Sequence, residues 1–212
     1  MIKEKLSAIL SSIPSDVTLV AVSKTKPIDQ IDKAYQCGQL DFGENKVQEM
    51  VDKAVSLPKN IRWHMAGHLQ RNKVKYIAPF VSLIHSVDSL RLLAEIDKQG
   101  KKNDRVIDCL LQVRIAQEDT KFGLTFEECH ALLQQLEYSN VRIRGLMGMA
   151  SFTTNRMQVE EEFTSLQRYY SQYQSKHQWD ILSMGMSGDY LLALACGSNM
   201  IRVGSRIFGA RK

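Results

Sequence analysis

The sequence predicts a closed (β/α)8 barrel of the TIM type, an α/β fold, preceded by an extra N-terminal helix. Short apolar runs alternate with longer segments of helical spacing, eight such runs fit within 212 residues, and no Gly-x-Gly-x-x-Gly follows the first run. Strands that alternate with helices pair in parallel through right-handed crossovers. Eight such units favour a closed barrel over an open doubly wound sheet, which more often has about five or six strands.

The predicted strands are the eight apolar runs. They cover residues 18–24, 40–43, 62–66, 82–87, 108–115, 143–149, 181–186 and 200–204. Apolar residues at helical spacing predict helices over 27–37, 45–55, 89–99, 125–138, 159–176 and 189–196. Residues 1–14 form a further predicted helix, expected to cover one end of the barrel, and the barrel fills 18–211 of a single domain spanning 1–212.

The composition argues against several classes of protein. The net charge of +5 comes from 28 basic and 23 acidic residues spread along the chain, and no aromatic residues interleave its densest basic pieces, 71–75 and 101–105. We therefore expect no nucleic-acid partner. The four cysteines lie far apart and read as reduced thiols, and no apolar stretch is long enough to span a membrane. We therefore expect the protein to be a cytoplasmic monomer that binds neither a membrane nor a metal.

Lys24 is the most informative residue. It closes the run Thr-Leu-Val-Ala-Val-Ser-Lys of residues 18–24 and is followed by Thr25-Lys26-Pro27, which does not prolong a buried strand. In α/β barrels, ligands and chemistry collect at the C-terminal ends of the strands. An amine at that place can form a Schiff base, although a solvated surface lysine is the alternative reading.

The last two strands end in a candidate anion site. Ser187 and Gly188 follow the seventh strand, while Gly204 ends the eighth and Ser205 follows it. Loops after strands seven and eight commonly hold phosphate in barrels. Each residue also has a plain structural reading, Ser187 as a helix N-cap and Gly204 as a turn glycine.

Barrel closure brings these two features together, because the eighth strand pairs with the first. A ligand that presents both an amine-reactive carbonyl and a phosphate is pyridoxal 5′-phosphate (PLP). Arg202, on the eighth strand, lies where a side chain could meet the pyridine nitrogen of that cofactor.

Here the chain resembles the pyridoxal phosphate homeostasis protein family, also called the YggS or proline synthetase co-transcribed family. The motifs that carry the resemblance are residues 21–27 (Ala-Val-Ser-Lys-Thr-Lys-Pro), 42–45 (Phe-Gly-Glu-Asn) with 47–49, 63–64 with 67–73, 144–147 (Arg-Gly-Leu-Met), 185–189 (Gly-Met-Ser-Gly-Asp) and 202–211. One departure is Ala150, where the family commonly has a proline.

The family in turn resembles the barrel domain of fold-type III alanine racemases. That likeness implies that Lys24 forms the Schiff base, that Ser187, Gly204 and Ser205 bind the phosphate, and that Arg202 faces the pyridine nitrogen. An arginine donates but does not accept a hydrogen bond, so the ring nitrogen would stay unprotonated and support carbanion chemistry weakly. Racemases also use a C-terminal β domain, which we do not expect in this chain.

Three further residues are candidates with open alternatives. Asn45 either contacts the cofactor or caps the following helix, His64 either faces the barrel mouth or is a satisfied core histidine, and Met147 either lines the cofactor ring or fills the core. The roles of Lys26, Lys73 and Arg211 stay undecided between secondary cofactor capture and plain solvation.

The resulting hypothesis is a cofactor-binding protein that takes part in PLP homeostasis, with PLP-dependent apoenzymes as candidate partners and without robust turnover. The alternative is a fold-type III amino-acid racemase or decarboxylase that takes its missing acid/base residue from another subunit.

Overall fold

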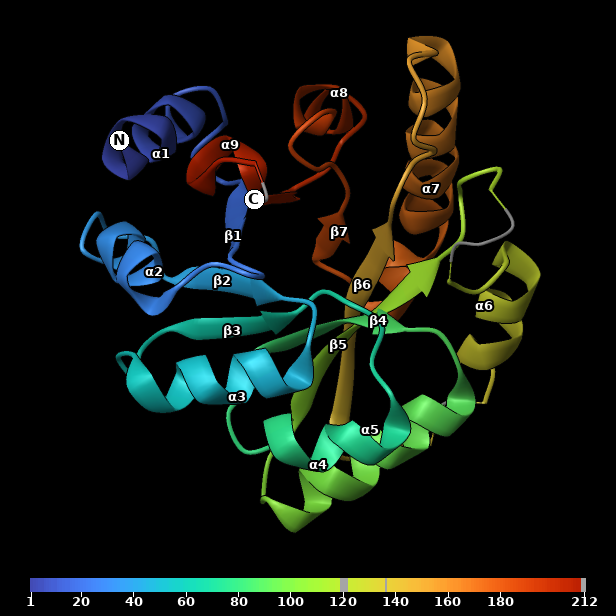
Figure 1. Cartoon of the computed structure of the whole chain (residues 1–212). Helices are drawn as coiled ribbons and strands as arrows, with labels where there is room; N and C mark the ends of the chain where they lie inside the picture. Colours follow the sequence, from blue (N-terminus) through green and yellow to red (C-terminus); the bar gives the residue numbers. More distant parts are fainter. Residues whose placement is uncertain (119–121, 136, 211–212) are drawn as a thin grey trace.

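The computed structural model describes residues 1–118, 122–135 and 137–210. Within them, eight parallel strands close into a barrel in sequence order, and the last strand pairs with the first (Figure 1). The strands are β1 Thr18–Val22, β2 Asp41–Glu44, β3 Arg62–Met65, β4 Leu83–Val87, β5 Ile107–Val113, β6 Val141–Gly148, β7 Ile181–Ser183 and β8 Met200–Val203. The predicted (β/α)8 barrel is confirmed.

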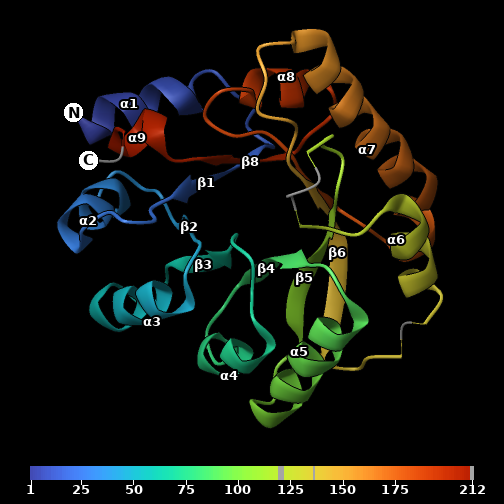
Figure 2. The ribbon, with the colours of Figure 1, turned by 45° about the vertical axis from the view of Figure 1, so that its right-hand side comes forward.

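The helices form an outer ring around the strands (Figure 2). They are α1 Ile2–Leu10, α2 Ile28–Tyr35, α3 Val47–Ser56, α4 Val74–Ile77, α5 Leu90–Lys102, α6 Phe126–Leu133, α7 Arg156–His177, α8 Tyr190–Ala195 and α9 Ser205–Phe208, with a 3-10 turn η1 at Arg71–Lys73. The six expected inter-strand helices are present, whereas α4 and α9 were not predicted because each is only one turn long.

The N-terminal helix differs from its expected place. It packs against α2 and α9 in the outer ring, and both views show it beside α9 rather than across an end of the barrel (Figures 1 and 2). Its buried residues, Leu6 and Ile9, belong to the core between the barrel and its helices. The helix after β8, α9, is only four residues long, and α1 lies beside it in the outer ring.

Side-chain alternation along the strands separates two apolar cores. Outward-facing residues such as Phe42, Trp63 and Leu111 pack under the helices. A smaller cluster fills the barrel interior and consists of Val20, Leu83, Leu110, Met147, Ile181 and Met200. This interior packing blocks any open channel and gives the residues at both strand ends a rigid base.

Six strands stop one to three residues earlier than predicted, and for β1 and β7 the backbone shows why. After Val22, Thr25 has a φ of 63°, and after Ser183, Gly185 has a φ of 90°. Left-handed backbone of this kind cannot continue an extended strand. Both interruptions lie at the C-terminal end of the barrel and turn the following loops over its mouth.

Two remaining expectations concern cysteines and membranes. All four cysteines lie in the described part of the chain and none is in a disulfide, with Cys109 and Cys129 buried as core residues. Among the described helices, none combines the length and the apolar character that crossing a bilayer requires.

Candidate functional site at the C-terminal end of the barrel

A cleft of about 490 Å³ opens at the C-terminal ends of the strands. Its size is typical of a site for a small ligand. The loops after β1, β2, β3, β6, β7 and β8 all contribute to it. It is lined by Val22, Lys24, Lys26, Asn45, Ala66, Met149, Phe152, Met186, Ser187, Gly188, Asp189, Arg202, Gly204, Ser205 and Gly209. Six of the eight candidate residues from the sequence therefore share one cleft.

The loop that carries Lys24 is held by a buried polar network that we call the Lys53 network, formed by Ser23, Thr25, Glu44, Glu49 and Lys53. The Lys53 ammonium donates to the Ser23 carbonyl oxygen at 2.8 Å, to Glu44 Oε1 at 2.8 Å and to Glu49 Oε1 at 2.6 Å. Ser23 Oγ donates to Glu44 Oε1 at 2.6 Å, and Thr25 N donates to Glu49 Oε1 at 2.6 Å. The residues on both sides of Lys24 are thus fixed to β2 and α3.

Two of the three charged groups in this network are buried, while the Glu49 side chain is 22% exposed. Glu44 is fully buried and Lys53 is only 5% exposed. Burial raises the pKa of Glu44, against the opposing effect of hydrogen bonds from Lys53 and Ser23. The Lys53 ammonium supplies the positive charge that a buried carboxylate requires.

A hydrogen bond joins the loops after β7 and β8. Gly204 N donates to Ser187 Oγ at 3.2 Å, and Arg206 Nε donates to the Ser187 carbonyl oxygen at 2.6 Å. The residue that caps α8 is Asp189, so the N-cap reading of Ser187 is wrong. The Ser187 hydroxyl instead lies in the cleft between the two loops that the sequence assigned to an anion.

Gly204 is required by the close approach of two backbones. A Cβ atom at this position would lie 2.9 Å from the carbonyl oxygen of Val22 on the neighbouring strand β1. Only glycine leaves room for β8 to end against β1 in this way. The approach brings Gly204 and Ser205 to the side of the cleft where Lys24 emerges.

Arg202 presents a buried cation to the floor of the cleft. Its Nη1 donates to the Ser183 carbonyl oxygen at 3.0 Å and to Ser183 Oγ at 2.6 Å, and its Nη2 donates to the Gly148 carbonyl oxygen at 3.0 Å. Burial lowers the pKa of Arg202 to about 10, which keeps the guanidinium charged at neutral pH. These three hydrogen bonds orient the guanidinium and leave part of its five N–H donors for a ligand.

Asn45 also lies in the cleft rather than at a helix cap. The N-cap of α3 is Lys46, so the capping alternative for Asn45 is wrong. A Cβ atom on Gly67 would lie 2.5 Å from the Asn45 carbonyl oxygen, so that only glycine allows this contact. Gly67, in the loop after β3, therefore sets the position of Asn45.

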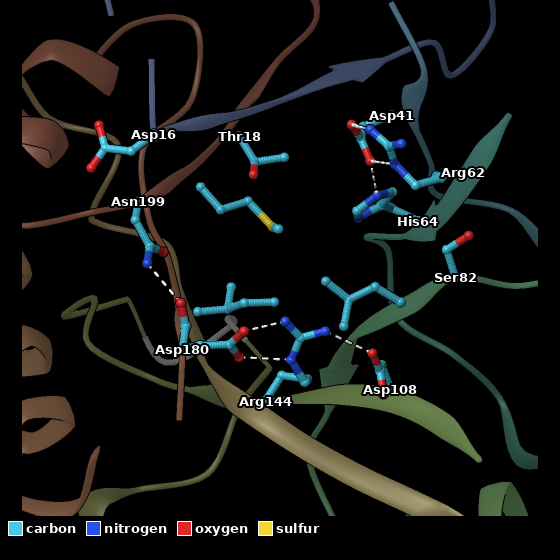
Figure 3. Close-up of a pocket in the computed structure, with 13 residues that line it drawn as sticks. Asp16, Thr18, Asp41, Arg62, His64, Ser82, Asp108, Arg144, Asp180 and Asn199 are labelled. Atoms are coloured by element: carbon cyan, nitrogen blue, oxygen red, sulfur yellow. Dashed lines mark hydrogen bonds and ion pairs between the residues drawn. The ribbon is translucent and has the colours of Figure 1, made fainter. Parts of the chain in front are cut away.

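The other two candidates lie deeper in the barrel. His64 is 3% exposed, contacts Asp41 and His85, and lines a second cavity at the N-terminal ends of the strands (Figure 3). Met147 is fully buried in the interior apolar cluster, whereas Met149, two residues later on the same face, lines the cleft. For both residues the structure supports the core reading and not the ligand reading.

The second cavity measures about 530 Å³ and is slightly larger, but most of its charged side chains already have partners. Arg62 pairs with Asp41, and Arg144 pairs with Asp108 and Asp180 (Figure 3). In barrels of this type the N-terminal face supports stability and the C-terminal face carries ligands. We therefore assign the functional site to the C-terminal cleft.

Some residues of this site were not found from the sequence. Lys53 carries a weak signal, since it stands four residues after Glu49 on a predicted helix, which is the spacing of a helical ion pair. Ser183 and His85 carry none, because both lie inside predicted strands and read as core residues. The sequence left the roles of Lys26 and Arg211 open. Lys26 donates to the carbonyl oxygens of Gly209 and Ala210. Arg211 lies outside the described residues.

This fold and cleft define a class: the family described as "Alanine racemase, N-terminal domain" matches residues 1–212. A "Pyridoxal phosphate homeostasis protein" of Haemophilus influenzae is 38% identical over 202 residues, which cover 92% of this chain and 85% of the relative. The chain therefore belongs to the pyridoxal phosphate homeostasis protein family, as the motifs of the sequence indicated.

Solved structures agree with this assignment. PipY of Synechococcus elongatus PCC7942 without PLP superposes with a TM-score of 0.94 at 36% identity, covering 99% of this chain and all of PipY. PipY with PLP bound superposes with a TM-score of 0.90 at 35% identity over the same shares of the two chains.

Proposed function

We propose that this protein binds PLP in the C-terminal cleft, holds it covalently on Lys24, and takes part in PLP homeostasis without robust catalytic turnover. The observation that carries the proposal is that Lys24, Arg202 and the pair of loops after β7 and β8 line one cleft. PLP presents an aldehyde, a ring nitrogen and a phosphate, and each of these groups has a chemically matched partner there.

The three matches use different chemistry. The Lys24 amine condenses with the aldehyde to form a Schiff base and releases one water. The Ser187 and Ser205 hydroxyls and the backbone at Gly204 offer hydrogen bonds to the phosphate. Arg202 offers only donors, so it favours an unprotonated ring nitrogen. PipY, a relative at 35% identity, has a solved structure with PLP bound.

Two features support a carrier rather than a catalyst. Bound PLP supplies an electron sink, and an unprotonated ring nitrogen makes that sink weaker. Proton transfer at a substrate carbon also needs a positioned acid and base. Among the described residues that line the cleft, none is a histidine, tyrosine, cysteine or glutamate, and Asp189 Oδ1 already accepts from Met186 N at 2.6 Å. Lys24 is then the main candidate for proton transfer.

We propose further that the protein acts as a monomer that supplies PLP-dependent apoenzymes in the cytoplasm. Phe152 and Met186, both exposed, stand at the edge of the cleft and leave its mouth open. Sedimentation analysis with and without PLP checks the monomer. Transfer of PLP to an apoenzyme, followed by the recovery of that enzyme's activity, checks the delivery role.

Borohydride reduction tests the attachment directly. Purified protein incubated with PLP should absorb in the near-ultraviolet and visible region, and peptide mapping after reduction should find the adduct on Lys24. Lys24→Ala should lose the adduct, Lys26→Ala should keep it, and Lys33→Ala on the exposed face of α2 serves as the control. An undiminished adduct in Lys24→Ala would refute the assignment.

A racemase or decarboxylase is the alternative, and membership of the alanine racemase N-terminal domain family favours testing it. Incubation of the PLP-loaded protein with amino acids in deuterated water measures exchange of the α-proton. Exchange at enzymatic rates, or release of carbon dioxide, would overturn the carrier proposal.

A further inference from the structure

A line of polar contacts crosses the interior of the barrel beneath the cleft. His64 Nε2 lies 3.0 Å from Asp41 Oδ1, and His64 Nδ1 lies 2.9 Å from His85 Nε2. His85 Nδ1 lies 3.4 Å from Ser183 Oγ, which is 2.6 Å from Arg202 Nη1. The four contacts join the N-terminal cavity of Figure 3, where Asp41 and His64 meet, to Arg202 in the opposite cleft.

The line runs through five different strands and is shielded from water. Asp41, His64, His85, Ser183 and Arg202 lie on β2, β3, β4, β7 and β8 in turn, with Asp41 at the outer end. His85 and Ser183 are fully buried, while His64 and Arg202 are 3% and 4% exposed. Buried polar groups of this kind are held in place by their hydrogen bonds, because a broken bond leaves a desolvated group unpaired.

The two ends of the line determine the direction of every hydrogen bond in it. Arg202 has donors only, so Ser183 Oγ accepts from it, and the Ser183 hydroxyl proton is left to donate to His85 Nδ1. The Asp41 carboxylate has acceptors only, so His64 Nε2 must carry a proton. A neutral His85 that accepts at Nδ1 carries its proton on Nε2, so it donates to His64 Nδ1.

Burial also keeps His85 neutral. Its side chain is surrounded by the barrel interior, and burial lowers its pKa well below the ordinary histidine value, with the charge of Arg202 acting in the same direction. A neutral ring with Nδ1 accepting and Nε2 donating is the tautomer that both neighbours need.

We propose that His85, held by His64 and Asp41, is a positioning residue for Arg202, and that the five residues form a one-way chain of hydrogen-bond donors from Arg202 through Ser183, His85 and His64 to Asp41. Asp41 is then the distant negative end of a chain whose positive end lies under the cleft. The direction of the chain is a property of the protein without ligand, while its effect on PLP rests on the proposed function.

Long-range proton–nitrogen correlation spectra of ¹⁵N-histidine-labelled, ligand-free wild-type protein test the direction. At about pH 8, above the ordinary histidine pKa, His64 and His85 should both show a protonated Nε2 and an unprotonated Nδ1. The other three of the five histidines serve as references. A protonated Nδ1 in either residue would overturn the proposed direction.

Two variants of His85 test the positioning. His85→Leu removes both hydrogen bonds, and we expect PLP affinity to fall about tenfold, with a shifted absorption spectrum of the bound cofactor. The glutamine of His85→Gln can accept from Ser183 and donate to His64. This variant should therefore bind PLP within about threefold of the wild-type affinity and show the wild-type spectrum. His130→Leu, on α6 outside the barrel, is the control.

The outcomes separate the two proposals. Wild-type affinity and spectrum in a folded His85→Leu protein would overturn the positioning role. Failure of the wild type to bind PLP would count against the proposed function, and the tautomers of the ligand-free protein would still decide the direction of the chain.

Discussion

Lys53 and Ser23 are 30 residues apart in the chain, yet the Lys53 ammonium lies 2.8 Å from the Ser23 carbonyl oxygen. Ser23 directly precedes Lys24, and Thr25, directly after it, is bound by Glu49, a partner of Lys53. The amine proposed to bind the cofactor is therefore carried by a backbone whose position depends on a buried ion-pair network. A change in this network should therefore alter both the stability of the protein and the binding of PLP, and each effect can be measured by itself.

Lys53→Met should weaken both folding and PLP binding. Removing the ammonium leaves Glu44 buried without its cation, which costs about 3 kcal/mol of unfolding free energy, and we expect PLP affinity to fall about tenfold as the Lys24 loop loosens. Urea unfolding and absorbance titration measure the two effects. The double variant Lys53→Met with Glu44→Gln should recover part of the stability, and Lys33→Met, from an exposed pair with Asp29, should change it by less than about 0.5 kcal/mol. Equal stability of Lys53→Met and wild type would contradict the network's role.

Gly204→Ala should disturb the cleft where Gly188→Ala does not. An added Cβ at Gly204 would lie 2.9 Å from the Val22 carbonyl oxygen, whereas nothing lies within 4 Å of one at Gly188. Since the Val22 oxygen belongs to the backbone of β1, β8 must shift, and we expect Gly204→Ala to lose PLP affinity by tenfold or more, on the order of 1 kcal/mol or above. Both glycines line the same cleft, so equal affinities in the two variants would show that the close approach is unimportant for binding.

Asp41→Asn should change the pH dependence of stability. Burial alone would raise the pKa of Asp41, but hydrogen bonds from Arg62 and His64 outweigh it and hold that pKa at about 2, against an ordinary 3.8. A carboxyl group whose pKa is lowered by folding stabilises the fold at pH values above its unfolded-state pKa. This stabilisation is lost as the pH falls through the folded-state pKa. The free energy of unfolding of the wild type should exceed that of Asp41→Asn by about 2 kcal/mol at pH 7. This difference should shrink as the pH drops from about 4 towards 2. A difference that stays constant down to acid pH would rule out this linkage.

Thr25→Gly should stabilise the protein. Thr25 has a φ of 63°, a region that costs a β-branched residue about 1–3 kcal/mol and costs glycine almost nothing. Glycine also gives the unfolded chain more conformational entropy, which offsets part of this gain. A net increase of about 0.5–1 kcal/mol in the free energy of unfolding remains. Calorimetry should record a higher melting temperature for Thr25→Gly and a lower one for Thr125→Gly, since Thr125 has a φ of −68° and caps α6. A lower melting temperature for Thr25→Gly would argue against strain at this position.

Much of the fold was readable in advance because its signals are local. Each of the eight strands overlaps a run that the apolar pattern marked, and the helices between them follow from periodicity. Positions at strand ends were equally accessible, since Lys24, Ser187, Gly204 and Ser205 stand directly after apolar runs and parallel strands end on one face.

The failures share a different origin. Alternation with a period of two tells which residues face the barrel interior, but not how deep they lie along its axis. Met147 and Met149 face the same way, yet only Met149 reaches the cleft, because the register of the closed barrel sets Met147 beside Ser183 and Gln112. His64 faces inward as well, but the pairing of Asp41 with Arg62 at the start of β2 and β3 places it near the N-terminal end.

The sequence by itself therefore determined the order of strands and helices, the face on which the loops gather, and the residues that stand at the ends of β1, β7 and β8, since these depend on neighbours along the chain. Only the tertiary structure decided that Lys53 holds the Lys24 loop and that His85 meets Ser183, 98 residues away. The second of these contacts crosses the barrel, and the distances in both depend on strand register and closure, which no local pattern encodes.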